Sequence, residues 1–275
     1  MTLPYPRIPP DIISFGPFKL RWYGVMYLVG YFVGYRLALS RIRRGASVLT
    51  QQQLDTLVAY LVVGMLIGAR LIYVFVYDFS EFRAHPWKAF AIWTGGLSFH
   101  GAIIGMACAI ALFARRYRVP TLAITDVVAL CGAPGLFFGR IGNFINGELY
   151  GRPTNVPWAM VFPTDPLHIP RHPSQLYEAF AEGVLLFFAL WLLDRRAHAR
   201  GWFWDGLLTG GFLVGYAMLR FLLEFTRQPD PQLGFIVGKF SMGQLLSTIM
   251  LLVGIVVLTA SRYRASKQVP TTASQ

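Results

Sequence analysis

Apolar residues dominate seven separate stretches of the chain, and polar connections rich in arginine, glycine and proline separate them. A helix that crosses a bilayer needs about 20 predominantly apolar residues, and each stretch is close to that length. The predicted membrane helices are residues 22–39, 54–76, 97–114, 122–139, 176–193, 203–225 and 240–260. The pattern therefore predicts an all-α membrane protein with about seven transmembrane helices.

Composition supports the same fold class. Of the 275 residues, 55% are hydrophobic and 14% are charged, whereas soluble domains carry about 25% charged residues. No signal peptide is expected, because the first residues contain several prolines and no basic start followed by an apolar core. We predict one polytopic membrane domain over residues 1–260 with short periplasmic loops, followed by a polar, frayed cytoplasmic tail over residues 261–275. Cys108 and Cys131 lie in apolar helix sequence and are expected to be packing residues.

Basic residues gather at alternate connections between the predicted helices, which indicates the cytoplasmic side of a membrane protein. The clusters are Arg41, Arg43 and Arg44; Arg115, Arg116 and Arg118; Arg195, Arg196 and Arg200; and Arg262, Arg264 and Lys267. The N-terminus is therefore expected outside and the C-terminus in the cytoplasm, with the clusters near anionic membrane lipids. The net charge of +12 does not predict nucleic-acid binding, because such a footprint would form a patch on one soluble domain.

Four arginines lie within or beside predicted membrane helices, where a central arginine costs about 2.5–3.5 kcal/mol of insertion free energy. Arg36 is near a cytoplasmic helix end, so its side chain can extend to the membrane surface. Arg70 either forms a buried pair that holds helices together or belongs to a polar cavity. Arg140 and Arg220 stand among other polar residues and are functional candidates.

Arg140 opens the run GRIGNFINGELYGR, residues 139–152, at the outer end of the fourth predicted helix. The run contains four further candidate site residues: Asn143, Asn146, Glu148 and Gly151. Glycines let backbone approach a ligand closely, and amides and guanidinium groups donate hydrogen bonds to oxyanions. A helix cap followed by a loop would explain the glycines and one asparagine, but it would not explain an arginine at membrane depth. We interpret the run as a binding segment.

The sixth predicted helix carries four polar residues on one face, because steps of three and four residues return to the same side of a helix. They are Tyr216, Arg220, Glu224 and Arg227. An ion pair between Arg220 and Glu224 is expected, and it would neutralise and orient the guanidinium. A polar stripe on a membrane helix must face a cavity or another helix.

Three other positions lie at outer ends of predicted helices. His100, in the run GGLSFHG, is expected to have a catalytic or substrate-contacting role, with its flanking glycines leaving space around the imidazole; a structural role is the alternative. In the run RHPSQLYE, Ser174 is the expected N-cap and Glu178 lies in the first turns, near the helix's positive end; a wall of the site is the alternative. Tyr23 either lines the site or anchors its helix at the membrane surface.

The common depth of these polar groups discriminates between functions. A transporter would place polar groups near the midplane, and the sequence has no Gly-x-Ser-x-Gly, His-Glu-x-x-His or paired intramembrane aspartates of a protease. An arginine-rich pocket without clustered metal ligands, facing the outer leaflet, suits the single phosphate charge of a phospholipid. A lipid transporter and a non-catalytic membrane scaffold remain alternatives, although neither explains all the clustered polar residues.

Five blocks in the same order along the chain resemble those of the prolipoprotein diacylglyceryl transferase family. The blocks are residues 96–101, 139–152, 171–178, 220–230 and 241–244, and residues 139–152 resemble the family signature. The likeness spans nearly the whole chain. Two departures are Thr94, where an acidic or amide residue is expected, and the short segment 162–171.

The resemblance implies a bacterial inner-membrane enzyme whose site faces the periplasm and which needs no cofactor or metal. It would transfer the diacylglyceryl group of phosphatidylglycerol to the lipobox cysteine of prolipoprotein signal peptides, forming a thioether and releasing glycerol phosphate. The implied catalytic residues are Arg140 and Arg220, which would bind the phosphate, and His100, the candidate base. The implied substrate-binding residues are Tyr23, Asn143, Asn146, Glu148, Gly151, Tyr216, Glu224 and Arg227.

Overall fold

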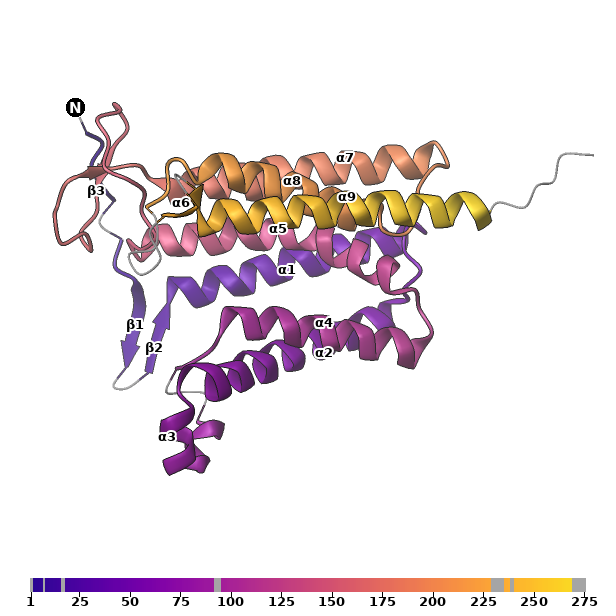
Figure 1. Ribbon diagram of the computed structural model, residues 1–275, viewed down its shortest axis with the longest axis horizontal. Helices are drawn as coiled ribbons and strands as arrows, with labels where there is room; N and C mark the ends of the chain where they lie inside the picture. The colour runs from indigo at the N-terminus through magenta and orange to yellow at the C-terminus, as the bar shows by residue number, and fades with distance from the viewer. Residues whose placement is uncertain are drawn as a thin grey trace, which may run out of the picture. The chain divides into compact units, whose positions relative to one another are not determined.

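Figure 1 shows the computed structural model of the protein, which describes residues 2–6, 8–15, 18–91, 95–228, 235–237 and 240–268. The α-helices are α1 Trp22–Arg43, α2 Gln51–Ile72, α3 Phe79–Ala84, α4 Phe99–Tyr117, α5 Thr121–Ile145, α6 Ser174–Glu178, α7 Leu186–Ala199, α8 Leu207–Leu223 and α9 Met242–Gln268. Two π-helices, η1 Tyr73–Tyr77 and η4 Ala179–Leu185, and the 3₁₀ helix η2 Pro86–Phe90 continue or connect them. Antiparallel pairs join β1 Asp11–Phe15 to β2 Phe18–Arg21, β3 Met160–Val161 to β4 Pro170–Arg171, and β5 Phe235–Val237 to β6 Phe240–Ser241.

The predicted all-α membrane class is confirmed by the length and apolar character of the helices. Five helical stretches in the described ranges can cross a membrane: Gln51–Tyr77, Phe99–Tyr117, Thr121–Ile145, Ser174–Ala199 and Met242–Lys267. Helix α8 is apolar but shorter, and α1 covers the first predicted stretch with 22 residues.

The prediction of a frayed tail over residues 261–275 is wrong for residues 261–268, because α9 continues to Gln268. Trp204 Nε1 donates a hydrogen bond to Ser261 Oγ at 3.1 Å, and the Arg262 guanidinium lies 5.2 Å from the Trp204 ring. These contacts hold the C-terminal part of the helix, which the polar composition predicted to be frayed. Residues 269–275, Thr94, Pro229 and Asp230 lie outside the described residues.

The chain forms two compact units. Unit 2, Leu39–Thr125, is built around the packing of α2 against α4. Gly64 and Gly68 of α2 face Gly101 and Gly105 of α4 so closely that a Cβ on any of them would collide with the opposite backbone. Small residues allow such close approach of membrane helices. The missing side chain of Gly101, which was expected to leave space around His100, makes room for Gly68.

Arg70 holds the connection between α2 and α4. Its guanidinium donates to the carbonyl oxygens of Ala89 at 2.8 Å, Gly95 at 2.7 Å and Gly96 at 2.9 Å, and also to those of Lys88 and Ala91. The expected holding role is thus present, but the partners are backbone carbonyls rather than a carboxylate.

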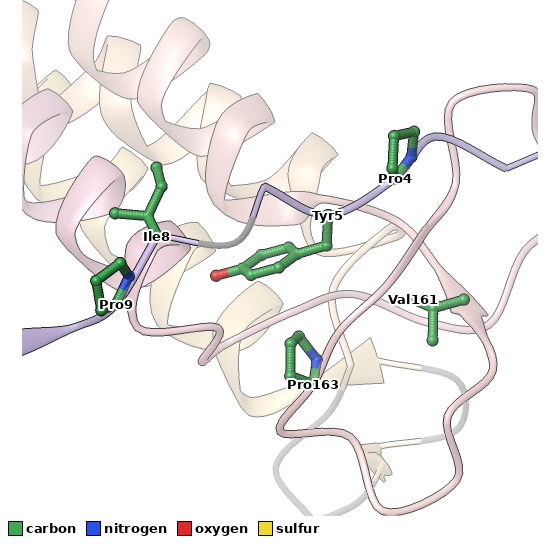
Figure 2. Close-up of a pocket in the computed structure, with 6 residues that line it drawn as sticks. All are labelled: Pro4, Tyr5, Ile8, Pro9, Val161 and Pro163. Atoms are coloured by element: carbon green, nitrogen blue, oxygen red, sulfur yellow. The ribbon is translucent and has the colours of Figure 1, made fainter.

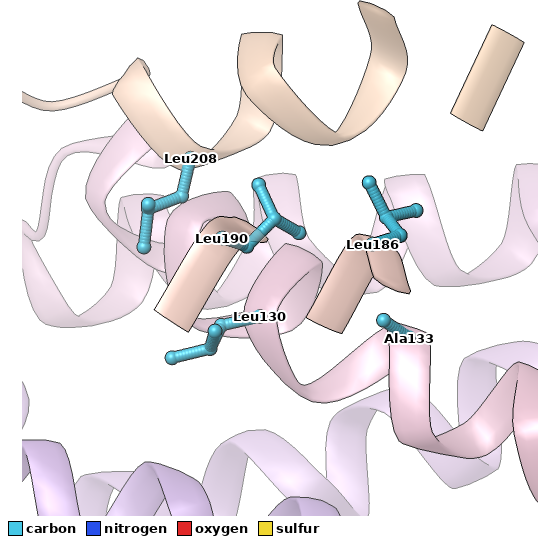
Figure 3. Packing of buried hydrophobic residues seen from close by; sticks show 5 residues of the cluster. All are labelled: Leu130, Ala133, Leu186, Leu190 and Leu208. Carbon is cyan, nitrogen blue, oxygen red and sulfur yellow. The ribbon is translucent and has the colours of Figure 1, made fainter. Parts of the chain in front are cut away.

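Unit 1, Met1–Ala38 with Asp126–Gln275, contains most of α1 and α5 and the helices from α6 to α9. Its apolar core lies where α5, α7 and α8 meet, at Leu130, Ala133, Leu186, Leu190 and Leu208 (Figure 3). Helix α1 approaches α5 closely at Gly34, whose carbonyl accepts a hydrogen bond from Cys131 Sγ at 3.1 Å. Cys131 is therefore a packing residue, as predicted, and both cysteines are free thiols.

Helix α8 is fixed at its first turn by a side chain from α5. Asp126, with 1% of its surface exposed, accepts hydrogen bonds from the backbone of Gly206 and Thr209 and from the Thr209 hydroxyl, each at 2.7 Å. The carboxylate thus satisfies helix N–H groups that have no partner within the helix. This contact at one end of α8 determines where its polar other end lies along α5.

Candidate active site

Arginines and glutamates from distant parts of the chain meet at one end of unit 1. Arg140 comes from the last turns of α5, Glu178 and Glu182 from α6 and η4, and Arg220, Glu224 and Arg227 from the end of α8 and the turn that follows. We call these six residues the arginine cluster. It unites the two arginines that the sequence singled out, and the Tyr216 side chain lies within hydrogen-bonding reach of Arg140.

Glu178 lies between the three arginines. Its Oε2 is 2.7 Å from Arg140 Nε, and its Oε1 is 3.1 Å from Arg227 Nη1 and 3.8 Å from Arg220 Nη1. The side chain is only 1% exposed. An isolated ionised carboxylate could not be buried so deeply, so the surrounding guanidinium groups stabilise it.

The capping interpretation of the RHPSQLYE run is wrong. The N-cap of α6 is Pro173, which makes no side-chain capping hydrogen bond. Ser174 Oγ instead donates to the Leu149 carbonyl at 2.9 Å. The alternative, that this segment forms a wall of the site, agrees with the position of Glu178.

The predicted pair between Arg220 and Glu224 is confirmed, with Arg220 Nη2 at 2.8 Å from Glu224 Oε2. Ser241 Oγ donates to Glu224 Oε1 at 2.9 Å, and a Cβ on Gly243 would lie 2.7 Å from the same carboxylate. The start of α9 therefore closes over Glu224. On the other side of its fork, Arg220 Nη1 is buried without a hydrogen-bond partner among the described residues.

Glu182 is a member of the cluster that the sequence interpretation missed. Its side chain is 0% exposed, and its Oε2 is 3.7 Å from Arg140 Nη2. It lies on the π-helix η4, where Gly183 packs directly against Phe137 of α5. The signal was present, because Glu178 and Glu182 are four residues apart in an otherwise apolar predicted helix.

A second polar group gathers where α5 ends. Asn143 Nδ2 and Asn146 Nδ2 donate to Glu148 Oε1 at 2.8 and 3.3 Å. Tyr23 packs on Gly142, and its hydroxyl lies near Asn143 and 3.0 Å from that of Tyr27. Asn143, Asn146 and Glu148 of the 139–152 run are thus adjacent, and Glu148 orients both amides.

Backbone contacts tie this run to the segment after α8. Gly151 N donates to the His172 carbonyl at 2.8 Å, and a Cβ on Gly151 would collide with the Thr226 carbonyl. Arg152 Nε donates to the Arg227 carbonyl at 2.7 Å. Gly151 therefore acts through close backbone approach, which positions Arg227 beside Glu178.

The short segment 162–171 is folded around one ion pair. Asp165 accepts hydrogen bonds from Arg171 Nε at 2.6 Å and Nη2 at 2.9 Å, and both residues are buried. The Arg171 guanidinium holds the pKa of the Asp165 carboxyl below its usual value, and the pair raises the pKa of Arg171. Burial lowers the pKa of the neighbouring His172. This pair anchors the loop that leads into α6.

His100 lies on α4 of unit 2, where its side chain is exposed and its ring contacts Phe99. Arg140 and Arg220 belong to unit 1. Arg36 is exposed on α1.

Figure 2 shows a cavity of about 560 Å³ in unit 1, lined by Pro4, Tyr5, Ile8, Pro9, Val161 and Pro163. Tyr5 donates to the carbonyls of Phe144 and Ile145 at the end of α5, at 2.5 and 3.1 Å. None of the predicted site residues lines this cavity, and the six described residues that line it have no charged side chain.

Comparison with known proteins gives the same family as the sequence blocks. A family model described as prolipoprotein diacylglyceryl transferase matches residues 10–260. The chain is 47% identical over 261 residues to a protein of Nitratidesulfovibrio vulgaris (strain Miyazaki F), covering 94% of this chain and 96% of that protein. It is 46% identical to a protein of Legionella pneumophila (strain Corby), covering 94% and 100%, and 43% identical to one of Azospirillum brasilense, covering 96% and 98%. All three relatives are named phosphatidylglycerol–prolipoprotein diacylglyceryl transferase.

Proposed function

The chain belongs to the prolipoprotein diacylglyceryl transferase family and transfers a diacylglyceryl group from phosphatidylglycerol to prolipoproteins, and we propose that its arginine cluster binds the phosphate of that lipid. One observation carries the proposal: Arg220 Nη1 is a buried guanidinium donor without a hydrogen-bond partner among the described residues, at the centre of the cluster. A buried unpaired donor is costly unless a ligand satisfies it.

Two other arginines provide the contrast. The Arg70 guanidinium donates hydrogen bonds to five backbone carbonyls, and Arg171 donates to Asp165 through two nitrogens. Both are held within the protein. Arg140 meets Glu178 through Nε, so the outer nitrogens of its planar fork remain suited to phosphate oxygens.

The chemistry follows from phosphate binding. The thiol of the lipobox cysteine loses its proton, and the sulfur attacks the lipid carbon that bears the phosphate oxygen. The carbon–oxygen bond breaks, and its electron pair stays with the departing glycerol phosphate while a thioether forms. A free thiol has a pKa of about 8.5, so a base or a positive field must raise the thiolate fraction. Arg140 and Arg220 stabilise the charge that gathers on the leaving phosphate.

The remaining candidates have supporting roles. Asn143 and Asn146 offer amide donors that Glu148 orients, and Tyr23 lies beside Asn143. Glu224 orients Arg220. Further positions are assigned to the lining of the site or to its framework: Tyr216, Gly151 and Arg227. His100 is the proposed base for the thiol.

The proposed topology has seven membrane helices in the bacterial inner membrane, including α1 and α8, within a domain of residues 1–260 and with residues 261–275 on the cytoplasmic side. Arg195, Arg196 and Arg200 stand at the end of α7, and Trp204 links the connection after them to Ser261 on α9, next to Arg262. The arginine cluster lies at the opposite ends of the same helices, beside η4 and the start of α9. The basic residues at the end of α7 and on α9 favour the cytoplasm. The arginine cluster, at the opposite ends of these helices, is therefore assigned to the periplasmic side.

Reporter fusions test this orientation. Fusions after Arg44, Arg118 and Arg200 are expected to report the cytoplasm, and a fusion near Thr154 is expected to report the periplasm. A cytoplasmic signal near Thr154 would invert the site and contradict the assignment to the outer leaflet.

An assay with purified protein in detergent, phosphatidylglycerol and a lipobox peptide tests the reaction. We expect a thioether-linked product whose formation is lost in Arg220→Lys. Lipid movement across reconstituted vesicles without product would instead favour a transporter.

A further inference from the structure

Glu182 is a buried carboxylate that the arginines do not need as a holding partner. Arg140 lies 2.7 Å and Arg227 lies 3.1 Å from Glu178, and Arg220 lies 2.8 Å from Glu224. Glu182 is 3.7 Å from Arg140 Nη2, and neither of its oxygens has a hydrogen-bond partner in the described part of the chain. Glu182 therefore fixes no side chain by hydrogen bonding, and every arginine of the cluster has a closer carboxylate in Glu178 or Glu224.

The fold nevertheless places this carboxylate inside the cluster. The side chain is 0% exposed, which is unfavourable for an ionised group without hydrogen bonds. It is carried by the π-helix η4, a rare element that is frequent at functional sites. The charged and titratable groups that face it are Arg140 from α5, Glu178 from α6, Arg220 and Tyr216 from α8, and Arg227 after α8.

On the basis of the proposed phosphate site, we propose that Glu182 is a charge-balancing residue that keeps the arginine cluster neutral and so allows the glycerol phosphate product to leave. With Glu182, three guanidinium groups face three carboxylates. Without it, the cluster carries one excess positive charge. The departing phosphate monoester carries up to two negative charges and the lipid diester carries one. An excess positive charge would therefore retain the product more strongly than it helps the lipid to bind.

The test measures glycerol phosphate as an inhibitor of Glu182→Gln, in which a neutral amide replaces the carboxylate at similar size. Assays run in detergent at about pH 8, where carboxyl groups ionise. The inhibition constant is expected to fall about tenfold, because one unit charge is removed within a few ångströms of the ligand. The kcat is expected to fall because release slows, and KM for phosphatidylglycerol is not expected to rise. Glu182→Asp retains the charge and is expected to keep the inhibition constant of the unmodified protein.

Asp194→Asn is the matched control. Asp194 is a fully buried acid about three turns further along the same helical stretch, and it pairs with His198 at 3.3 Å, outside the cluster. Asp194→Asn is expected to leave the inhibition constant of glycerol phosphate, the kcat and the KM for phosphatidylglycerol unchanged. If Glu182→Gln does not fold, Glu182→Met, which is also neutral, is measured in its place.

The outcomes separate this inference from the proposed function. A folded, neutral variant that binds glycerol phosphate no more tightly, or more weakly, overturns the charge-balancing role. If glycerol phosphate inhibits the unmodified protein and Arg220→Lys equally, the phosphate site itself is wrong, whatever Glu182 does.

Discussion

Arg140 on α5 and Glu178 on α6 face each other with 2.7 Å between Nε and Oε2, although 38 positions separate them in the numbering and the whole connection between α5 and α6 lies between them. The same carboxylate also contacts Arg227 and lies 3.8 Å from Arg220. One glutamate thus connects all three arginines of the cluster. The position of the arginines depends on Glu178 as well as on their own helices.

Glu178→Gln is therefore expected to destabilise the protein as well as inactivate it. Removing one partner of a buried ion pair typically costs about 3–5 kcal/mol, because the other charge stays buried. Thermal unfolding in detergent measures the loss. Glu81→Gln is the control, because Glu81 pairs with Lys88 at an exposed site with 41% of its side chain accessible. Equal unfolding temperatures for the two variants would contradict the central role of Glu178.

The pair of Asp165 and Arg171 predicts a pH dependence of the stability of the segment between α5 and α6. Because the folded-state pKa of Asp165 lies below its usual 3.8, the pair contributes its full stability above that value and loses it as the pH falls through the folded-state pKa. Asp165→Asn is expected to increase proteolysis of residues 147–173 at neutral pH. The difference between the two proteins should shrink below about pH 4, and a difference that persists unchanged in acid would show that the carboxylate charge is unimportant.

His100 is the candidate base, and its test depends on pH. If the imidazole accepts the thiol proton, His100→Ala lowers kcat by about 10²–10⁴-fold while lipid binding is retained. Raising the pH should partly restore the rate, since more thiol then ionises without help. Rate against pH is measured for both proteins, with phosphatidylglycerol binding as the control. Joint loss of lipid affinity and thermal stability, without rescue at alkaline pH, would assign His100 a structural role.

Apolar length predicted the helices well because the bilayer sets a common minimum for every span. It predicted the polar site less completely. The helical periodicity predicted that Tyr216, Arg220 and Glu224 share one face of α8. The Arg220–Glu224 ion pair joins residues four positions apart, so their spacing in the sequence was enough to predict it. Glu178 was assigned to helix capping because its arginine partners come from two other helices, and such contacts leave no trace in local spacing.

Two other differences have similar causes. Arg70 binds backbone carbonyls, and carbonyls are present at every residue, so no sequence pattern could indicate its partners. Gly101 was interpreted through its neighbour His100, but its close contact with Gly68 depends on how α4 packs on α2. In both cases the information lies in tertiary packing rather than in composition.

The most direct test of the phosphate site is the kcat/KM of Arg220→Lys for phosphatidylglycerol, measured beside Arg140→Lys and Arg36→Lys. Lysine keeps the charge but loses the planar fork that binds two phosphate oxygens. Arg220→Lys and Arg140→Lys are expected to insert and fold but to lose about 10²–10³-fold in turnover, whereas Arg36→Lys, at an exposed position of α1, should be nearly unchanged. Equal activity in all three variants would contradict the account, because the arginines would then serve the fold alone.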